Sequence, residues 1–262
     1  MMDVNQALQG ALRPHSGVAQ PAPGPALVLG AGGWLGAALL AQVLAAGHGP
    51  VGVWVRQPMA STHRGLLSLT EQTLAAPTPA DRLRWQGGTA VVVLERAGLV
   101  GARDGAFLAP EVADLKVLAA QLLDLGVIRL VVVVPHAAAS LPAALRQGLA
   151  HPDEVALVAM GFKQVLLVRS SRDALDVPAG TPWWERVAAW WWAQLRWMVP
   201  SDERPLRSVA LARVVVRAAR LLGEVPQGVW VLPQDVASRA AHAPAGLDCV
   251  LRPWLDGAVG SH

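Results

Sequence analysis

The sequence predicts a doubly wound α/β domain, in which helices cover both faces of a parallel sheet. Two observations lead to this prediction. Short apolar runs rich in Val and Leu alternate along the chain with longer segments of helical pattern. The runs are nearly continuous in their apolar character, which is typical of strands buried on both faces. The chain has 262 residues, of which 53% are hydrophobic, and this is enough to bury one large core.

The expected elements follow one another in a simple order. Strands are expected at 26–29, 51–55, 66–70 (the weakest), 89–94, 128–134, 164–168 and 228–232. Helices are expected at 34–46, 110–125, 141–160, 183–198 and 206–222. Alternation of strands with helices implies parallel crossovers. We expect one domain at 26–250, a flexible tail at 1–25 and a C-terminal tail at 251–262.

Composition and charge exclude several classes of protein. The net charge is only +3 and no nucleic-acid-binding module is recognisable, so we expect no nucleic-acid partner. Arg213, Arg217 and Arg220 recur at helical spacing and are expected to form a solvated face, the alternative being a contact with phosphate. The single cysteine, Cys249, excludes a disulfide framework and a Cys-rich zinc site, and it indicates a reducing compartment. Residues 1–25 lack the pattern of a secretory signal, and no apolar run reaches the roughly 18–20 residues that cross a bilayer. We therefore expect a cytoplasmic protein with no transmembrane segment and no metal site.

The most informative stretch is 26-ALVLGAGGWLGAALLAQVLAAG-47, where a strand pattern runs through several glycines into a helix pattern. The spacing G-x-G-x-x-G is not met, because Leu35 stands where its last glycine belongs, but G-x-x-G-x-x-G is met by Gly30, Gly33 and Gly36. In such a turn the first glycine lets the chain turn sharply, the second lets a pyrophosphate approach the backbone, and the third lets the helix pack closely. We predict a dinucleotide-binding turn, the alternative being a turn that binds nothing. Its predicted cofactor-binding residues are Gly30, Gly32, Gly33, Trp34, Leu35 and Gly36.

A family resemblance starts from the same residues. The segment 27-LVLGAGGWLGAALLAQVLAAGH-48 resembles the start of extended and atypical short-chain dehydrogenases/reductases, whose loop reads like G-A-T-G-F-L-G, with Trp34 at the aromatic position. The segments 112–135, 154–171 and 205–232 are similar to three later helix–strand pairs of that family. The resemblance covers most of residues 26–235, and it implies a Rossmann-like domain that binds a nicotinamide dinucleotide.

The end of the second expected strand bears on the choice of cofactor. An NAD-selective site places Asp or Glu there, whereas 51-VGVWVRQP-58 offers Arg56 and no acid. An arginine can bind a 2′-phosphate through two charge-assisted hydrogen bonds. We therefore expect NADP(H) in preference to NAD(H), the alternative being that Arg56 is a solvated charge. If the loop folds back, His63 and Arg64 join the phosphate site. The resemblance also implies that two small residues after the fourth strand lie against the riboses, Ala97 and Gly98.

The catalytic residues that the resemblance implies are missing. Hydride transfer in that family uses a Tyr as proton donor, a Lys four residues later and a Ser near the carbonyl. The chain contains no Tyr, and alignment places Gly148, Pro152 and Pro135 at the three positions. A standard active site is therefore excluded.

One histidine is a weak candidate for an acid or base in place of that Tyr. His136 comes immediately after the fifth expected strand, at the carboxyl edge where open α/β sheets bind ligands. Ser140 and His151 are near it in sequence. The alternative is a loop histidine that is bonded to backbone or solvent.

The segment 182-PWWERVAAWWWAQLRWMVP-200 holds six of the chain's 11 Trp. As a helix it is apolar on most sides, so we expect it to contact a second copy of the chain or to wall a pocket for an apolar small molecule. The alternatives are core packing against the sheet and a helix on a membrane surface. The residues assigned to this substrate or partner surface are Trp183, Trp184, Trp190 and Trp191.

Three functions remain open from the sequence. The favoured one is an NADP(H)-binding protein without the standard catalytic residues, which acts as a cofactor-dependent sensor or binding module. The second is an oxidoreductase with a non-standard proton donor that reduces an apolar carbonyl or quinone-like substrate. The third is a scaffold or oligomerisation protein in which the nucleotide site is vestigial.

Overall fold

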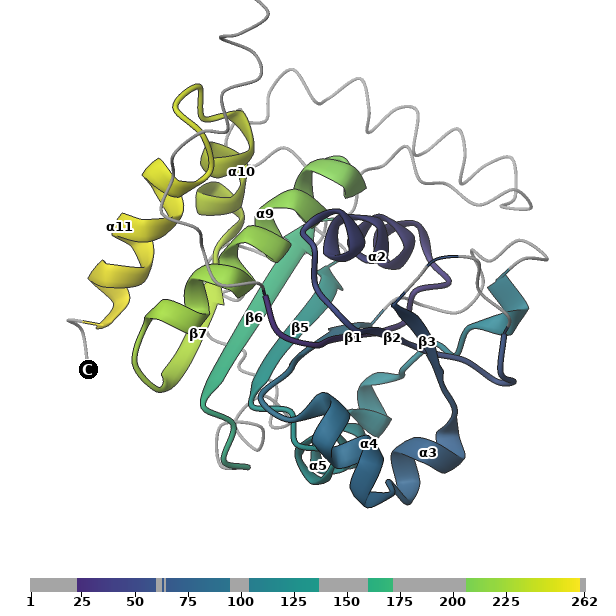
Figure 1. Cartoon of the computed structure of the whole chain (residues 1–262). Helices are drawn as coiled ribbons and strands as arrows, with labels where there is room; N and C mark the ends of the chain where they lie inside the picture. Colours follow the sequence, from purple (N-terminus) through teal and green to yellow (C-terminus); the bar gives the residue numbers. More distant parts are fainter. Residues whose placement is uncertain are drawn as a thin grey trace, which may run out of the picture.

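The computed structural model describes residues 23–59, 63, 65–94, 104–136, 160–171 and 206–259. Within these ranges seven strands form one fully parallel sheet, in the order β3-β2-β1-β4-β5-β6-β7 (Figure 1). The strands are β1 (Ala26–Leu29), β2 (Val51–Trp54), β3 (Leu66–Leu69), β4 (Thr89–Val93), β5 (Arg129–His136), β6 (Gln164–Ser171) and β7 (Gly228–Leu232). The doubly wound α/β class is therefore confirmed.

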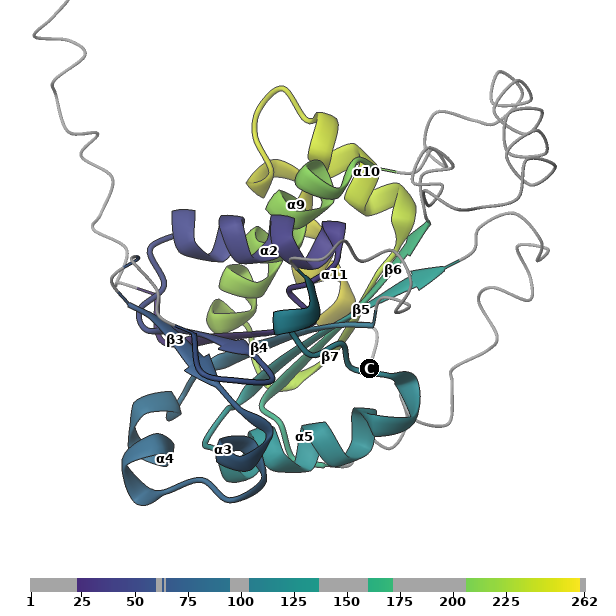
Figure 2. The same cartoon turned by 90° about the vertical axis from the view of Figure 1, so that its right-hand side faces the viewer.

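Helices cover both faces of the sheet, as the two views show (Figures 1 and 2). On one face lie α2 (Trp34–Ala45), α9 (Ser208–Leu221), α10 (Gln234–His242) and α11 (Asp248–Val259). On the other face lie α3 (Glu71–Ala75), α4 (Pro79–Trp85) and α5 (Leu115–Asp124). Three short 3₁₀ turns complete the described elements: η1 (Asp104–Ala106), η2 (Val112–Asp114) and η5 (Leu222–Glu224).

The apolar runs of the strands supply both layers of the core. In β5, Val131 and Val133 pack under α2 and α9, while Leu130 and Val132 pack under α5. Successive side chains of a strand point to opposite faces, so a strand buried on both sides needs apolar residues at every position. This is why the sequence shows continuous apolar runs.

The chain crosses from strand to strand with two different hands. From β1 to β2 the chain moves toward the β3 edge of the sheet, and the connecting helix α2 lies on one face. From β4 to β5 the chain moves toward the β7 edge, and the connecting helix α5 lies on the other face. Because both the direction and the face are reversed, these two crossovers have the same hand. From β6 to β7 the chain also moves toward the β7 edge of the sheet. Helix α9, which precedes β7, nevertheless lies on the same face as α2. This last crossover therefore has the opposite hand, against the strong general preference for right-handed connections.

The predicted elements compare closely with the observed ones. All seven predicted strands are present, and the helices predicted at 34–46, 110–125 and 206–222 correspond to α2, α5 and α9. The prediction for β5 ended too early, because its ladder with β6 continues to the pair His136–Ser171. The helices predicted at 141–160 and 183–198, and all but the last residues of the predicted tail at 1–25, lie outside the described residues.

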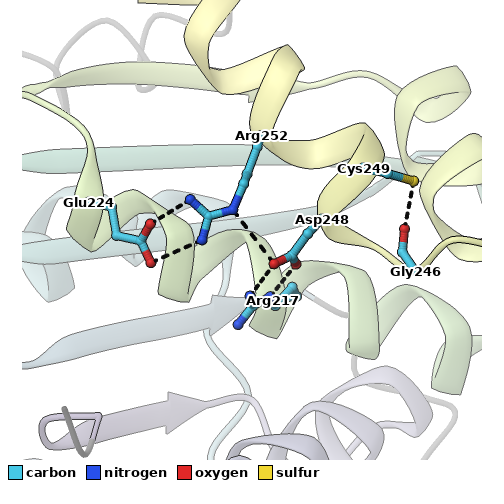
Figure 3. A network of polar contacts seen from close by, with 6 residues as sticks. All are labelled: Arg217, Glu224, Gly246, Asp248, Cys249 and Arg252. Atoms are coloured by element: carbon cyan, nitrogen blue, oxygen red, sulfur yellow. Dashed lines mark hydrogen bonds and ion pairs between the residues drawn. The ribbon is translucent and has the colours of Figure 1, made fainter. Parts of the chain in front are cut away.

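The C-terminal segment needs a correction. Residues 251–259, expected to be a tail, belong to helix α11, and Leu251 and Leu255 are buried in the core beside α9 and α10. Arg217 of α9 forms an ion pair with Asp248, and Arg252 donates a hydrogen bond of 2.8 Å from Nη1 to Glu224 Oε2 (Figure 3). The arginines of α9 are thus not simply a solvated face, since Arg217 fastens α11 to the domain.

Candidate functional site

The glycine turn connects β1 to α2 at the carboxyl edge of the sheet. Gly30 has a φ of +87°, in the region that favours glycine, so the chain leaves β1 through a sharp turn. Gly33 is the N-cap of α2 and has extended backbone angles, and the helix begins at Trp34. The structure therefore shows the sharp strand–turn–helix that the spacing of Gly30, Gly33 and Gly36 predicts.

Two of these glycines are required by close contacts between backbone segments. A Cβ at Gly36 would lie 1.9 Å from the carbonyl oxygen of Gly30, so only glycine lets α2 approach the turn this closely. A Cβ at Gly30 would lie 2.4 Å from the carbonyl oxygen of Val93, at the end of β4. The turn is consequently held between β1, β4 and the first turn of α2.

The N-terminus of α2 is free of side-chain caps. Gly33 has no side chain with which to accept a hydrogen bond, and no acidic residue lies in the first turn. The first N–H groups of a helix lack intrahelical partners and carry a partial positive charge, so such an end attracts anions. By contrast, α3 and α4 are capped by Thr70 and Thr78. Trp34, at the first position of α2, is 67% exposed.

The turn stands where the winding of the sheet reverses. β1 leads into α2 on one face, while its neighbour β4 precedes α5 on the other face. Crevices for ligands in open α/β sheets form at the carboxyl ends of the strands at such a switch point. The glycine turn and the uncapped N-terminus of α2 therefore both lie at the switch point of the sheet.

Arg56 follows β2 at the same edge and is exposed. No acid occurs between residues 51 and 59, so the edge beside the glycine turn carries a cation and no carboxylate from this strand. His63 is exposed, its carbonyl accepts a hydrogen bond from Leu66 N at 3.3 Å, and its side chain is not free of partners. Arg64 lies outside the described residues.

A short segment crosses the carboxyl edge beside Arg56. We call residues 104–110 the strap. Arg56 N donates a hydrogen bond of 2.9 Å to the carbonyl oxygen of Ala106, and Leu108 N donates one of 3.2 Å to the carbonyl oxygen of Trp54. Val55 and Phe107 face each other as an antiparallel bridge between these two bonds. This pairing cannot be predicted from the sequence, because the strap has neither a strand pattern nor a motif.

Of the other predicted site residues, the structure describes the position of His136 but not that of most others. His136 is the last residue of β5 rather than a loop residue beyond it, and its register partner is Ser171, the last residue of β6. Both therefore stand at the carboxyl edge, on the β4 side of the switch point. Eight residues that the sequence singled out lie outside the described ranges: Ala97, Gly98, Ser140, His151, Trp183, Trp184, Trp190 and Trp191.

The shifted titratable groups of the described residues lie away from this edge. Burial, more than the neighbouring Arg220 and Arg129, lowers the pKa of His48 at the amino edge, where its Nδ1 is 3.0 Å from the carbonyl oxygen of Gly24. Burial also lowers the pKa of Arg129, and the ion pair with Arg217 lowers that of Asp248. These shifts belong to structural contacts and assign no acid or base to the glycine turn.

The described part of the chain contains no candidate for a metal site or for a membrane span. No group of three or more His, Cys, Asp and Glu residues is placed to hold a metal ion there. None of the described helices combines the length and the apolar character that crossing a membrane requires.

Comparison with solved structures finds chains of similar topology at low identity. A mutant short-chain dehydrogenase/reductase from Serratia marcescens is 14% identical, over 82% of this chain and 99% of that chain, with a TM-score of 0.45. A short-chain dehydrogenase from Streptomyces avermitilis is 18% identical, over 93% and 100%, with a TM-score of 0.42. The Bordetella bronchiseptica enzyme WbmH, solved in complex with NAD+, is 13% identical, over 86% and 81%, with a TM-score of 0.44.

The fold is Rossmann-like. Its strand order and its helices on both faces establish this directly. No protein-family profile and no curated protein sequence matches the chain. With TM-scores below 0.5, the structural likenesses assign this Rossmann-like domain neither a family nor an activity.

Proposed function

We propose that the chain binds NADP(H) and acts as a cofactor-dependent sensor or binding module. The observation that carries this proposal is the glycine turn from β1 into the uncapped N-terminus of α2, at the switch point of the sheet. Such a turn suits a pyrophosphate, because unpaired N–H groups and the positive end of the helix meet where no side chain stands in the way. Gly33, Trp34, Leu35 and Gly36 would hold the pyrophosphate.

Arg56 would select the phosphorylated cofactor. Its exposed guanidinium stands at the end of β2, where an NAD-selective site would have a carboxylate. A guanidinium can bind a 2′-phosphate with two hydrogen bonds, and hydrogen bonds to charged groups contribute about 1.5–3 kcal/mol. The same group would contribute little to NADH, which has no 2′-phosphate.

The absence of Tyr separates the proposed function from a standard reductase. Bound NADP(H) supplies hydride-transfer chemistry, but reduction of a carbonyl also needs a proton at the oxygen. No Tyr exists in the chain to donate it. A protein that binds the cofactor and responds to it needs no such donor, so the binding role accounts for the residues without further assumptions.

The second candidate function is an oxidoreductase with His136 as proton donor. It is favoured by one observation: the register places His136 beside Ser171 at the carboxyl edge, on the side of the switch point opposite β2. A histidine exchanges a proton near neutral pH, as a replacement for the missing Tyr would have to do. Turnover of NADPH with an aromatic quinone, lost in His136→Ala while NADPH binding is retained, would favour this candidate over the sensor.

A fluorescence titration tests the proposed function. Purified protein is titrated with NADPH and separately with NADH, following Trp emission and energy transfer to the nicotinamide. We expect NADPH to bind more tightly, and Arg56→Ala to weaken NADPH by about 10- to 100-fold while leaving NADH unchanged. Arg213→Ala, which removes an exposed arginine of α9, is the matched control. Failure of both nucleotides to bind at millimolar concentration would refute the proposal and leave the scaffold role.

A further inference from the structure

The strap occupies the place beside β2 that β1 leaves empty. β1 pairs with β2 up to Val28 and Val53, and after Leu29 the chain turns away at Gly30. Beyond that point the chain continues from β2 through Val55 to Arg56, and its free edge is paired with the strap through the hydrogen bonds at Trp54 and Arg56. The strap thus runs directly above the end of β1.

Side chains anchor the strap on both faces of the sheet. Leu108 is buried in the core under α5, and Phe107 packs against the core on the side of α2. Pro110 lies against Gly30, with its Cδ 3.1 Å from the position of a Cβ there. Between these anchors Ala109 is exposed. The strap therefore contacts the core on both faces of the sheet at its carboxyl edge.

The ligand of the proposed function would need the same space. Its pyrophosphate would bind at the N-terminus of α2 and its 2′-phosphate at Arg56. The adenosine ribose that joins these groups has to cross the end of β1, because α2 begins at the turn after β1 and Arg56 follows the neighbouring strand, about 4.8 Å away. That crossing is the position of the strap.

We propose that the strap and the adenosine half of NADP(H) exclude each other, so that cofactor binding releases residues 104–110 from β2. This inference rests on the proposed function, and it identifies the strap as the segment that changes conformation when the cofactor binds. Release of the strap frees the N–H groups of Arg56 and Leu108 and exposes Phe107, which changes the surface at the carboxyl edge. The closed strap also lowers the apparent affinity in proportion to the fraction of molecules that are open, about 100-fold if one molecule in a hundred is open.

A reversible disulfide tests this directly. Val55 and Phe107 are a non-hydrogen-bonded antiparallel pair, for which the Cα atoms lie about 4.5 Å apart, within the range that a disulfide spans. The double variant Val55→Cys/Phe107→Cys is made in a Cys249→Ser background, since Cys249 is exposed. We expect the oxidised form to bind NADPH at least tenfold more weakly than the reduced form, with recovery on reduction. The single cysteine variants are the controls, and equal affinity of the oxidised and reduced forms would overturn the inference.

Two further measurements separate this inference from the proposed function. Hydrogen exchange of the wild-type amides at Arg56 and Leu108 should become faster on saturation with NADPH, and slower exchange would overturn the inference. Phe107→Ala, which removes an anchor but keeps both hydrogen bonds, should bind NADPH several-fold more tightly. Equal affinity of Phe107→Ala and the wild type for NADPH would overturn the inference alone, and binding by neither would refute the proposed function together with the inference.

Discussion

Gly36→Ala tests the part of the site on which everything else depends. The new Cβ would lie 1.9 Å from the Gly30 carbonyl oxygen, whereas such a carbon–oxygen contact is normally about 3.3 Å, so α2 must shift by about 1.4 Å. The same Cβ would lie 2.8 Å from the Gly30 carbonyl carbon and 2.9 Å from Ala31 Cα, so no rotation of a side chain relieves the clash. Overpacking costs 1–3 kcal/mol, and with backbone on both sides we expect about 3 kcal/mol, or roughly 6–12 °C in Tm.

The same chemical change elsewhere provides the control. Gly257 also lies in a helix, α11, but it is exposed and a Cβ there would meet nothing within 4 Å. Gly257→Ala should therefore stabilise the protein by about 0.5 kcal/mol, since Ala has the higher helix propensity. Both variants are compared by urea unfolding, followed by Trp fluorescence. If Gly36→Ala unfolds within about 1 kcal/mol of the wild type, the close packing of α2 on the Gly30 turn is not rigid, and the argument from that contact fails.

Two further predictions concern the rest of the domain. Because burial holds the pKa of His48 below its ordinary value, the unfolded chain binds the extra proton first, and stability should fall as pH drops below about 6.5. His48→Gln, which can still donate to the Gly24 carbonyl, should flatten this slope in urea titrations between pH 5 and 7.5; an unchanged slope would contradict the assignment. Asp248→Asn breaks the ion pair with Arg217 and should cost about 1 kcal/mol, with a smaller loss at high salt. Faster exchange of the α11 amides would accompany that loss, whereas unaltered exchange would mean that apolar contacts alone hold the helix.

The strands could be predicted because each carries its own signal. A central parallel strand is buried on both faces, so its sequence is a short apolar run wherever it occurs, as in 89–93 and 129–134. The glycine turn could be predicted for a similar reason, since a sharp turn and a close helix each demand glycine at a fixed spacing. These features are local, and local features are readable from one sequence.

Four helices escaped prediction for physical reasons. α3 and α4 have five and seven residues, too few to show helical periodicity, although the Thr78–Asp81 capping box was a readable signal for α4. α10 follows Pro233 and has few large apolar residues. α11 contains Pro253, which interrupts a helical pattern, and its docking depends on Leu251, Leu255 and a partner on α9.

The strap was unpredictable because it depends on contacts between distant segments. Nothing in residues 104–110 alone indicates pairing with Val55 and Arg56, which lie about fifty residues earlier in the chain. The pairing arises because the chain turns away from β2 at Gly30, while the chain of β2 runs on through Val55 to Arg56 with its edge unpaired by β1. The point at which one strand stops pairing with its neighbour is a property of the assembled sheet, so it becomes visible only in the structure.

The strap and the missing Tyr support the same function. An enzyme must exchange its cofactor in every catalytic cycle. A segment that the cofactor has to displace lowers the apparent affinity for the cofactor in every one of these cycles. A sensor benefits from that reduction, because it brings half-saturation to a higher cofactor concentration and couples occupancy to a change of structure. The absence of Tyr has no consequence for such a protein, whereas in a reductase both features would need compensation. Arg56 takes part both in closing the strap and in binding the cofactor. Its backbone N–H donates a hydrogen bond to the strap, and its guanidinium would bind the 2′-phosphate of the cofactor that displaces the strap.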